Sequence, residues 1–145
     1  MPQKSSNLVK LYGFTLLRNG VKYDYSFRES FTSLSHISEE VYVALDKGDD
    51  NSLEESQKIP GVKIIPSTWD MALKKGLVLS VETNKALEAL RKDHGQEDNA
   101  WGIYLQADEV LHEDDYDRLI KDIEEAQRTG CLLYTSPSPR DLSTS

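Results

Sequence analysis

Four short apolar segments recur along the first 105 residues, and a stretch of helical or polar character separates each from the next. A segment this short that is apolar throughout suits a strand covered on both faces, as in a parallel sheet. Strands that alternate with helices predict an α/β domain with a mostly parallel sheet, helices on both faces and right-handed crossovers. The expected strands are Leu11–Leu17, Val41–Leu45, Val62–Ile65 and Trp101–Leu105.

The segments between these strands carry helical signals. Apolar residues recur at three- and four-residue spacing, which is the period of one helix face. Ser52 stands three residues before Glu55, the spacing of a capping box, so a short helix is expected to start at Ser52. The expected helices cover roughly Tyr25–Ser35, Ser52 to the residue before Pro60, Val81–Asp93 and a last helix around Tyr116 that ends at Gly130, whereas Ser67–Leu79 is expected to be irregular, with Trp69 as its anchor.

Composition narrows the class of protein. A chain of 145 residues predicts one compact domain, and a net charge of −8 argues against sequence-independent nucleic-acid binding, which needs a basic face. The sequence has no apolar run long enough for a membrane helix, and its first twenty residues lack a secretory signal. A single cysteine, Cys131, allows no internal disulfide. We therefore expect a cytoplasmic protein, with a peripheral position at the inner membrane face left open.

The last fifteen residues, 131–145, differ from the rest of the chain. They read CLLYTSPSPRDLSTS and have neither a helical nor a strand period. The first eleven resemble the translation of a transposase sequencing adapter, and the alternative is a natural disordered Ser/Pro terminus. We therefore assign residues 1–130 to the domain and 131–145 to an artefactual or disordered tail. On this interpretation the natural chain continued beyond Gly130, and the sequence is an N-terminal fragment.

Acidic residues follow two of the predicted strands directly. Asp46, Asp49 and Asp50 follow the second strand, and Asp108 and Glu109 follow the fourth. Ligands of open α/β sheets bind outside the carboxyl ends of the strands, so both groups are expected at one edge, about 10 Å apart if one strand separates them. A nucleotide could bridge them if Mg²⁺ or Mn²⁺ sits between carboxylate and diphosphate. The alternative is that these acids are solvated loop residues or helix N-terminal charges.

Two motifs in these loops resemble those of family-two glycosyltransferases. Asp46-Lys47-Gly48-Asp49-Asp50 resembles their Asp-Asp-Gly-Ser-x-Asp loop, and Gln106-Ala107-Asp108-Glu109 resembles their Asp-Ala-Asp-Glu loop. The resemblance covers roughly residues 8–128 and implies the N-terminal half of a GT-A fold. It departs from the family at Lys47 and Gln106, which replace acids, so a weaker or differently shaped metal site is expected.

The resemblance implies transfer of a sugar from a nucleotide diphosphate to a hydroxyl of a glycan, lipid or protein acceptor, usually with inversion. It implies a divalent metal at Asp108 and Glu109, and a catalytic base in the second half of the domain. No catalytic residue is therefore assigned, and this chain alone is not expected to turn over. The residues implied to bind the nucleotide are Leu17, Arg18, Asn19, Asp46, Asp49, Asn84, Lys85 and Gln106.

Two other functions remain open from the sequence. One is a different nucleotide-dependent α/β enzyme, such as a sugar nucleotidyltransferase, although Arg18-Asn19-Gly20 is a poor match to its Gly-rich basic loop. The other is an acidic interaction or receiver-like module without catalysis. No Gly-x-Gly-x-x-Gly or Walker motif indicates a dinucleotide cofactor or a P-loop. The histidines lack ligand spacing: His36 and His94 are expected at surface or helix-end positions, and His112 is a weak metal-shell candidate.

Overall fold

A single four-stranded sheet forms the centre of the domain. The computed structural model describes residues 9–130, so the tail assignment for residues 131–145 lies outside the described part. All strand pairs are parallel, and the strand order is β3-β2-β1-β4. The prediction of an α/β domain with a mostly parallel sheet is confirmed. The strands are β1 (Lys10–Arg18), β2 (Val41–Asp46), β3 (Val62–Pro66) and β4 (Ala100–Tyr104).

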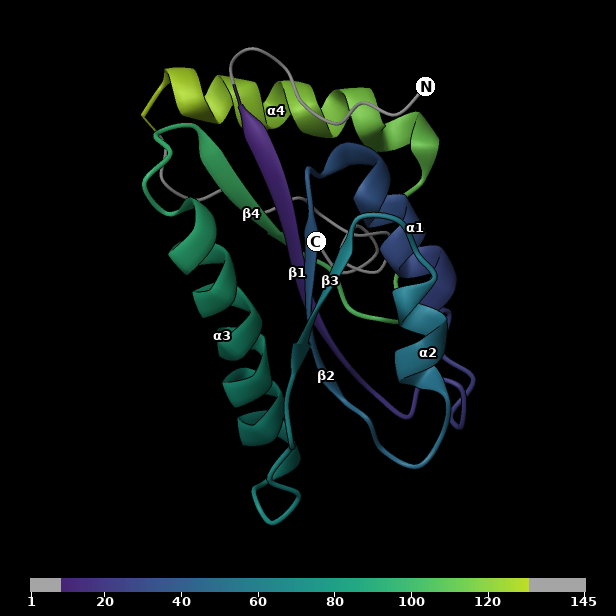
Figure 1. The fold of residues 1–145 in the computed structure, drawn as a ribbon. Coiled ribbons are helices and arrows are strands. Elements are labelled where there is room, and N and C mark those ends of the chain that lie inside the picture. The colour runs from purple at the N-terminus through teal and green to yellow at the C-terminus, as the bar shows by residue number, and fades with distance from the viewer. Residues whose placement is uncertain (1–8, 131–145) are drawn as a thin grey trace.

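Helices cover both faces of this sheet, as predicted (Figure 1). The long helix α3 lies along one face, while α1 and α2 lie on the other, and α4 crosses the end at which β1 begins. A single turn of 3₁₀ helix, η1, leads directly into α4. The helices are α1 (Phe27–Ile37), α2 (Ser52–Gln57), α3 (Lys75–His94) and α4 (Tyr116–Arg128), with η1 at Glu113–Asp115.

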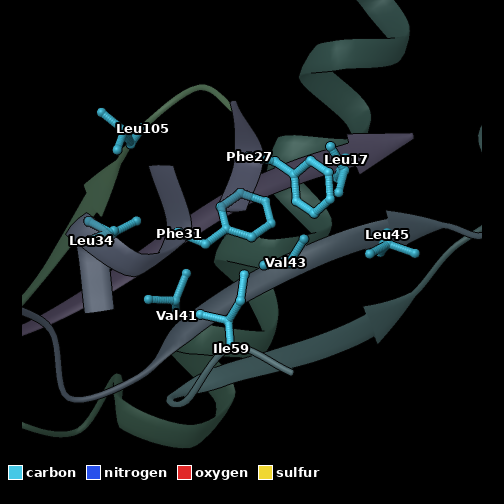
Figure 2. Packing of buried hydrophobic residues seen from close by; sticks show 9 residues of the cluster. All are labelled: Leu17, Phe27, Phe31, Leu34, Val41, Val43, Leu45, Ile59 and Leu105. Atoms are coloured by element: carbon cyan, nitrogen blue, oxygen red, sulfur yellow. The ribbon is translucent and has the colours of Figure 1, made fainter. Parts of the chain in front are cut away.

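The apolar strands fill the core between these helices. Phe27, Phe31 and Leu34 of α1 are fully buried against β1 and β2, and residues Val41–Leu45 of β2 are all buried (Figure 2). Gly13 of β1 permits this close packing, because a Cβ atom there would lie 2.5 Å from Leu34 Cδ2. The continuous apolar run of β2 is therefore the signature of a strand covered on both faces.

Two local predictions are wrong. The segment Ser67–Leu79 is not irregular throughout, because α3 begins at Lys75 and absorbs its last five residues. Its apolar residues show no helical period: Val78 is buried, while Leu77 and Leu79 stay exposed beside it. Helix α2 begins at Ser52, as predicted, but Ser52 does not cap it, because its N-cap is Asn51. The Ser52 hydroxyl instead accepts a hydrogen bond from the Val21 amide at 3.0 Å.

Within residues 9–130, no helix combines the length and the apolar character that crossing a bilayer requires.

Candidate functional site

The carboxyl ends of the four parallel strands meet at one edge of the sheet. In the register of β1 and β2, Arg18 pairs with Asp46, and both residues end their strands. Strand β1 separates β2 from β4, so the loops carrying Asp46 and Asp108 lie on either side of one strand. Both acidic groups therefore lie at one edge of the sheet, on either side of one strand, as the sequence predicted.

A pocket of about 610 Å³ lies at this edge. Its size is that of sites for small organic ligands, and such sites are mostly apolar with a few polar groups. Arg18 and Asp108 are its charged lining residues, and four of the predicted site residues (Leu17, Arg18, Gln106 and Asp108) line it. The lining comes from β1 (Leu16, Leu17, Arg18), the loop after β1 (Tyr23, Tyr25), the segment from Trp69 into α3 (Trp69, Met71, Leu73, Val78, Leu79), and the end of β4 with the loop after it (Tyr104, Gln106, Ala107, Asp108).

Asp46 lies beside this pocket but is absent from its lining. Its Oδ2 accepts a hydrogen bond from the Trp69 amide at 2.9 Å and lies 3.5 Å from Arg18 Nε. Its Oδ1 accepts the Gly48 amide at 2.8 Å. The carboxylate therefore ties together three segments of the edge and orients two lining residues, Arg18 and Trp69, whereas the resemblance implied that it contacts the nucleotide.

Asn19 and Asp49, two further predicted nucleotide contacts, join the two loops that follow β1 and β2. Asn19 is 1% exposed and has a positive φ of 54°, and its Oδ1 accepts the Asp49 amide at 2.9 Å. The Asp49 carboxylate pairs with Lys22 Nζ at 3.0 Å, and this hydrogen bond holds the pKa of Asp49 below its usual value. Gly48 has a φ of 60° and a side chain there would overlap Asn19, which explains the glycine. Neither predicted contact lines the pocket.

Asn84 and Lys85 lie on α3, outside the pocket lining, and both are exposed. Lys85 Nζ donates to Glu82 Oε2 at 2.8 Å and to Ser67 Oγ at 2.7 Å, while Ser67 Oγ donates to the other oxygen of Glu82. Glu82 is 1% exposed, and the sequence prediction missed it. Its place four residues after Val78 and four before Ala86, on the buried face of α3, is the signal that could have found it.

The two predicted metal ligands follow β4. Asp108 lines the pocket, whereas Glu109 Oε1 accepts the Gln106 amide at 3.1 Å and the Glu109 amide donates to the Gln106 carbonyl at 2.9 Å. Within residues 9–130, no group of three or more His, Cys, Asp or Glu side chains is arranged to hold a metal ion. A cation at Asp108 would therefore have to take its other ligands from substrate phosphates and water, as Mg²⁺ commonly does.

The histidines lie outside the pocket lining. His36, in the last turn of α1, has its Nδ1 3.3 Å from the Tyr116 hydroxyl, which agrees with the expected helix-end position. His112 is exposed and precedes η1 as its N-cap, and no contact supports its metal-shell role.

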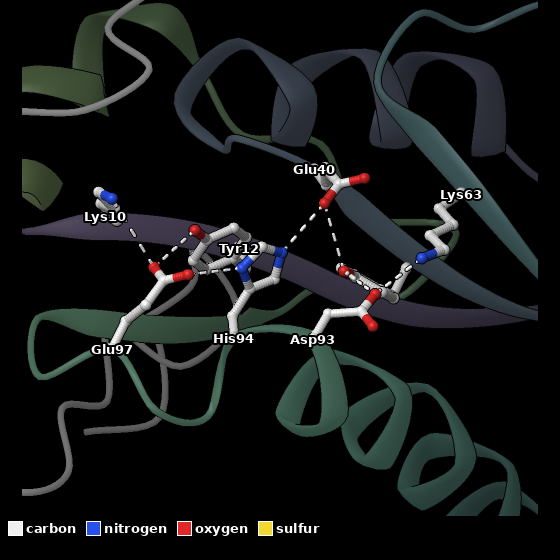
Figure 3. Close-up of polar contacts among 8 residues, drawn as sticks. Lys10, Tyr12, Glu40, Lys63, Asp93, His94 and Glu97 are labelled. Carbon is white, nitrogen blue, oxygen red and sulfur yellow. Dashed lines mark hydrogen bonds and ion pairs between the residues drawn. The ribbon is translucent and has the colours of Figure 1, made fainter.

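His94 sits in a polar cluster at the opposite, amino edge of the sheet (Figure 3). Its ring stacks on Tyr12 with centroids 4.0 Å apart, and its Nδ1 and Nε2 lie 2.7 Å from Glu97 and 3.1 Å from Glu40. Burial lowers the pKa of His94, but the hydrogen bonds with these two carboxylates outweigh it and raise the pKa above its usual value. The cluster therefore binds the end of α3 to the sheet.

The same cluster continues to β2 and β3. The Tyr42 hydroxyl donates to Asp93 Oδ2 at 2.7 Å, and Lys63 Nζ lies 2.7 Å from the same oxygen. The hydrogen bond from Lys63 holds the pKa of Asp93 below its usual value, while burial raises the pKa of Tyr42 well above its own. Tyr12 and Tyr42 are strand residues whose hydroxyls reach a partner, and these contacts are structural.

Comparison of the chain with protein-family models, with curated proteins and with solved structures finds no match. The class that the fold and the pocket define is a parallel α/β domain with a ligand-sized pocket at the carboxyl edge of its sheet.

Proposed function

We propose that this pocket binds a nucleoside-diphosphate sugar together with a divalent cation, as the donor half of a glycosyltransferase. The observation that carries the proposal is the convergence of Arg18 and Asp108, from the ends of neighbouring strands, on one pocket at the carboxyl edge. The resemblance of the Gln106–Glu109 segment to the metal-binding loop of family-two glycosyltransferases supports the same assignment.

The two charged lining residues suit different parts of such a donor. The Asp108 carboxylate would offer an oxygen ligand to Mg²⁺ or Mn²⁺, and the bound cation would supply the positive charge that a diphosphate needs beside a carboxylate. When bound, the cation offsets the charge that develops on the leaving diphosphate. Arg18, held by Asp46, supplies a fixed guanidinium whose planar donors suit phosphate oxygens.

Transfer to an acceptor hydroxyl of a glycan, lipid or protein also requires a base. Among the lining residues, the one carboxylate is Asp108, which the cation uses. Glu82, the buried carboxylate nearest in sequence to the lining residues of α3, is occupied by Ser67 and Lys85. We therefore assign no catalytic base among the residues that line the pocket, and we expect this chain to bind the donor without turning it over.

The test is calorimetric titration of the full 145-residue chain with uridine and guanosine 5′-diphosphate, each with and without Mn²⁺. We expect binding that requires Mn²⁺ and that is lost in Asp108→Asn. Asp117→Asn is the matched control, because Asp117 is an exposed acid in the first turn of α4. Absence of nucleotide binding, or binding that ignores both Mn²⁺ and Asp108, would overturn the proposal.

A further inference from the structure

Two tyrosines in the loop after β1 present exposed rings to the pocket. Tyr23 is 54% exposed and Tyr25 is 41% exposed, and both line the pocket. Their ring centroids lie 6.0 Å apart and their planes are inclined by 40°. Large aromatic side chains usually bury their rings, so two exposed rings at a ligand-sized pocket mark a surface on which a ligand can stack.

Hydrogen bonds within the loop fix the backbone that carries these rings. The Tyr23 amide donates to the Asn19 carbonyl at 3.0 Å, and the Tyr25 amide donates to the Gly20 carbonyl at 2.9 Å. Between them, the Asp24 amide donates to the Val21 carbonyl at 3.1 Å. Three successive backbone amides of the loop, those of residues 23–25, thus donate hydrogen bonds to carbonyls within the same loop.

Hydrogen bonds to the loop after β2 also hold the backbone of the loop that carries Tyr23 and Tyr25. The Lys22 amide donates to Asp50 Oδ2 at 2.7 Å, and the Val21 amide donates to Ser52 Oγ at 3.0 Å. The buried Asn19 side chain completes this link through the Asp49 amide. Since the backbone is fixed before a ligand arrives, stacking on the rings requires little further ordering of the loop.

We propose that Tyr23 and Tyr25 form the stacking surface for the nucleobase of the donor. This inference rests on the proposed function and deepens it. In this proposal the diphosphate lies with the cation at Asp108, on the segment after β4. The two tyrosine rings are on the segment after β1, so they are left for the base. An aromatic surface favours a flat unsaturated ring, and stacking tolerates any base because each has a π-face.

Two other candidates for contact with the base are weaker. Asp46, which the resemblance implies as a nucleotide contact, is absent from the lining and accepts hydrogen bonds from the Trp69 and Gly48 amides. Tyr104 also lines the pocket and is 42% exposed, but it precedes Gln106 on the segment that carries Asp108. We assign Tyr104 to the part of the donor next to the diphosphate.

The experiment measures dissociation constants of the full chain for uridine and guanosine 5′-diphosphate with Mn²⁺, and for Mn²⁺–pyrophosphate, which lacks a base. The variants are Tyr23→Leu/Tyr25→Leu, Tyr23→Phe/Tyr25→Phe and Tyr104→Leu, each checked for folding by circular dichroism. We expect the double leucine variant to weaken the tighter nucleotide by about 10-fold and to leave pyrophosphate unchanged. The double phenylalanine variant retains the rings and should bind as the wild type does.

The outcomes separate this inference from the proposed function. Unchanged nucleotide affinity in the double leucine variant overturns the stacking surface alone, as does an equal loss for pyrophosphate. A larger loss in Tyr104→Leu than in the double leucine variant places the base against Tyr104 and also overturns the inference. A wild-type chain that binds no nucleotide overturns the proposed function, and the inference with it.

Discussion

Arg18 and Asp46, which end adjacent strands in register, form an ion pair with Arg18 Nε 3.5 Å from Asp46 Oδ2. The same carboxylate oxygen accepts the Trp69 amide. The Asp46 side chain thus holds both Arg18 and Trp69, and both of these residues line the pocket. The pair explains why Asp46 matters to the pocket without lining it.

Replacing Asp46 should destabilise the fold as well as the pocket. Asp46→Ala removes the acceptor for the Trp69 and Gly48 amides and leaves Arg18 unpaired at this position. Since hydrogen bonds to a charged group of low exposure are the strong ones, we expect the free energy of unfolding in urea to fall by about 2 kcal/mol. Asp49→Ala in the same loop is the control, because the Asp49 side chain is exposed and its ion pair contributes little. Equal losses in the two variants would contradict this role for Asp46.

The close approach of β1 and α1 gives a second prediction. Gly13→Ala places a methyl group 2.5 Å from Leu34 Cδ2 in a fully buried site, so the free energy of unfolding should fall by about 1–3 kcal/mol. Gly76→Ala is the matched control, because no atom lies within 4 Å of a Cβ there and alanine suits a helix better than glycine. Urea denaturation should show a loss for the first variant and none for the second. Wild-type stability in Gly13→Ala would mean that α1 can move away from β1 without loss.

The elements that sequence reasoning predicted best are those with a single strong pattern. Val41–Leu45 is apolar throughout and becomes a strand buried on both faces, and Phe27, Phe31 and Leu34 at helical spacing become the buried face of α1. The start of α3 was missed because its apolar residues run together, and an uninterrupted run cannot show a helical period.

The pocket was predictable in part for a similar reason. Parallel strands bring the end of β1, which carries Arg18, and the segment after β4, which carries Asp108, to the same edge of the sheet. The direction of the Asp46 side chain depends on the Trp69 amide, 23 residues away, and the exposure of Tyr23 depends on a loop held by Asp50 and Ser52. Contacts between segments remote in sequence leave no local pattern, so these features had to come from the structure.

The buried carboxylate of α3 gives a third prediction. Glu82→Ala removes a 1% exposed side chain that accepts hydrogen bonds from Ser67 and Lys85, so the free energy of unfolding should fall by about 2 kcal/mol. Glu88→Ala is the control on the same helix, because Glu88 pairs with Arg91 where both side chains are largely exposed. Chemical denaturation of both variants checks the difference. If Glu82→Ala is as stable as Glu88→Ala, the buried network contributes nothing net to folding.

The His94 cluster makes stability depend on pH in a direction that its contacts fix. The pKa of His94 is raised in the folded state, so the folded chain binds the proton more tightly than the unfolded chain. This contribution is fully present below the unfolded pKa of about 6.5 and is lost as the pH rises through the higher folded value. His94→Gln removes it, so the difference in unfolding free energy between wild type and variant should shrink as the pH rises above about 6.5.

Glu97, a partner of His94, sets the lower end of the pH range in which the contribution of His94 can be measured alone. Hydrogen bonding to His94 lowers the pKa of Glu97, so the stability that Glu97 contributes is present above its unfolded pKa of about 4.3 and is lost as the pH falls through its folded value. Urea denaturation of wild type and His94→Gln between about pH 5.5 and 9 therefore isolates the histidine, because Glu97 stays ionised there. A stability difference that is constant across this range would show that His94 holds α3 to the sheet through stacking on Tyr12, with no contribution from its charge.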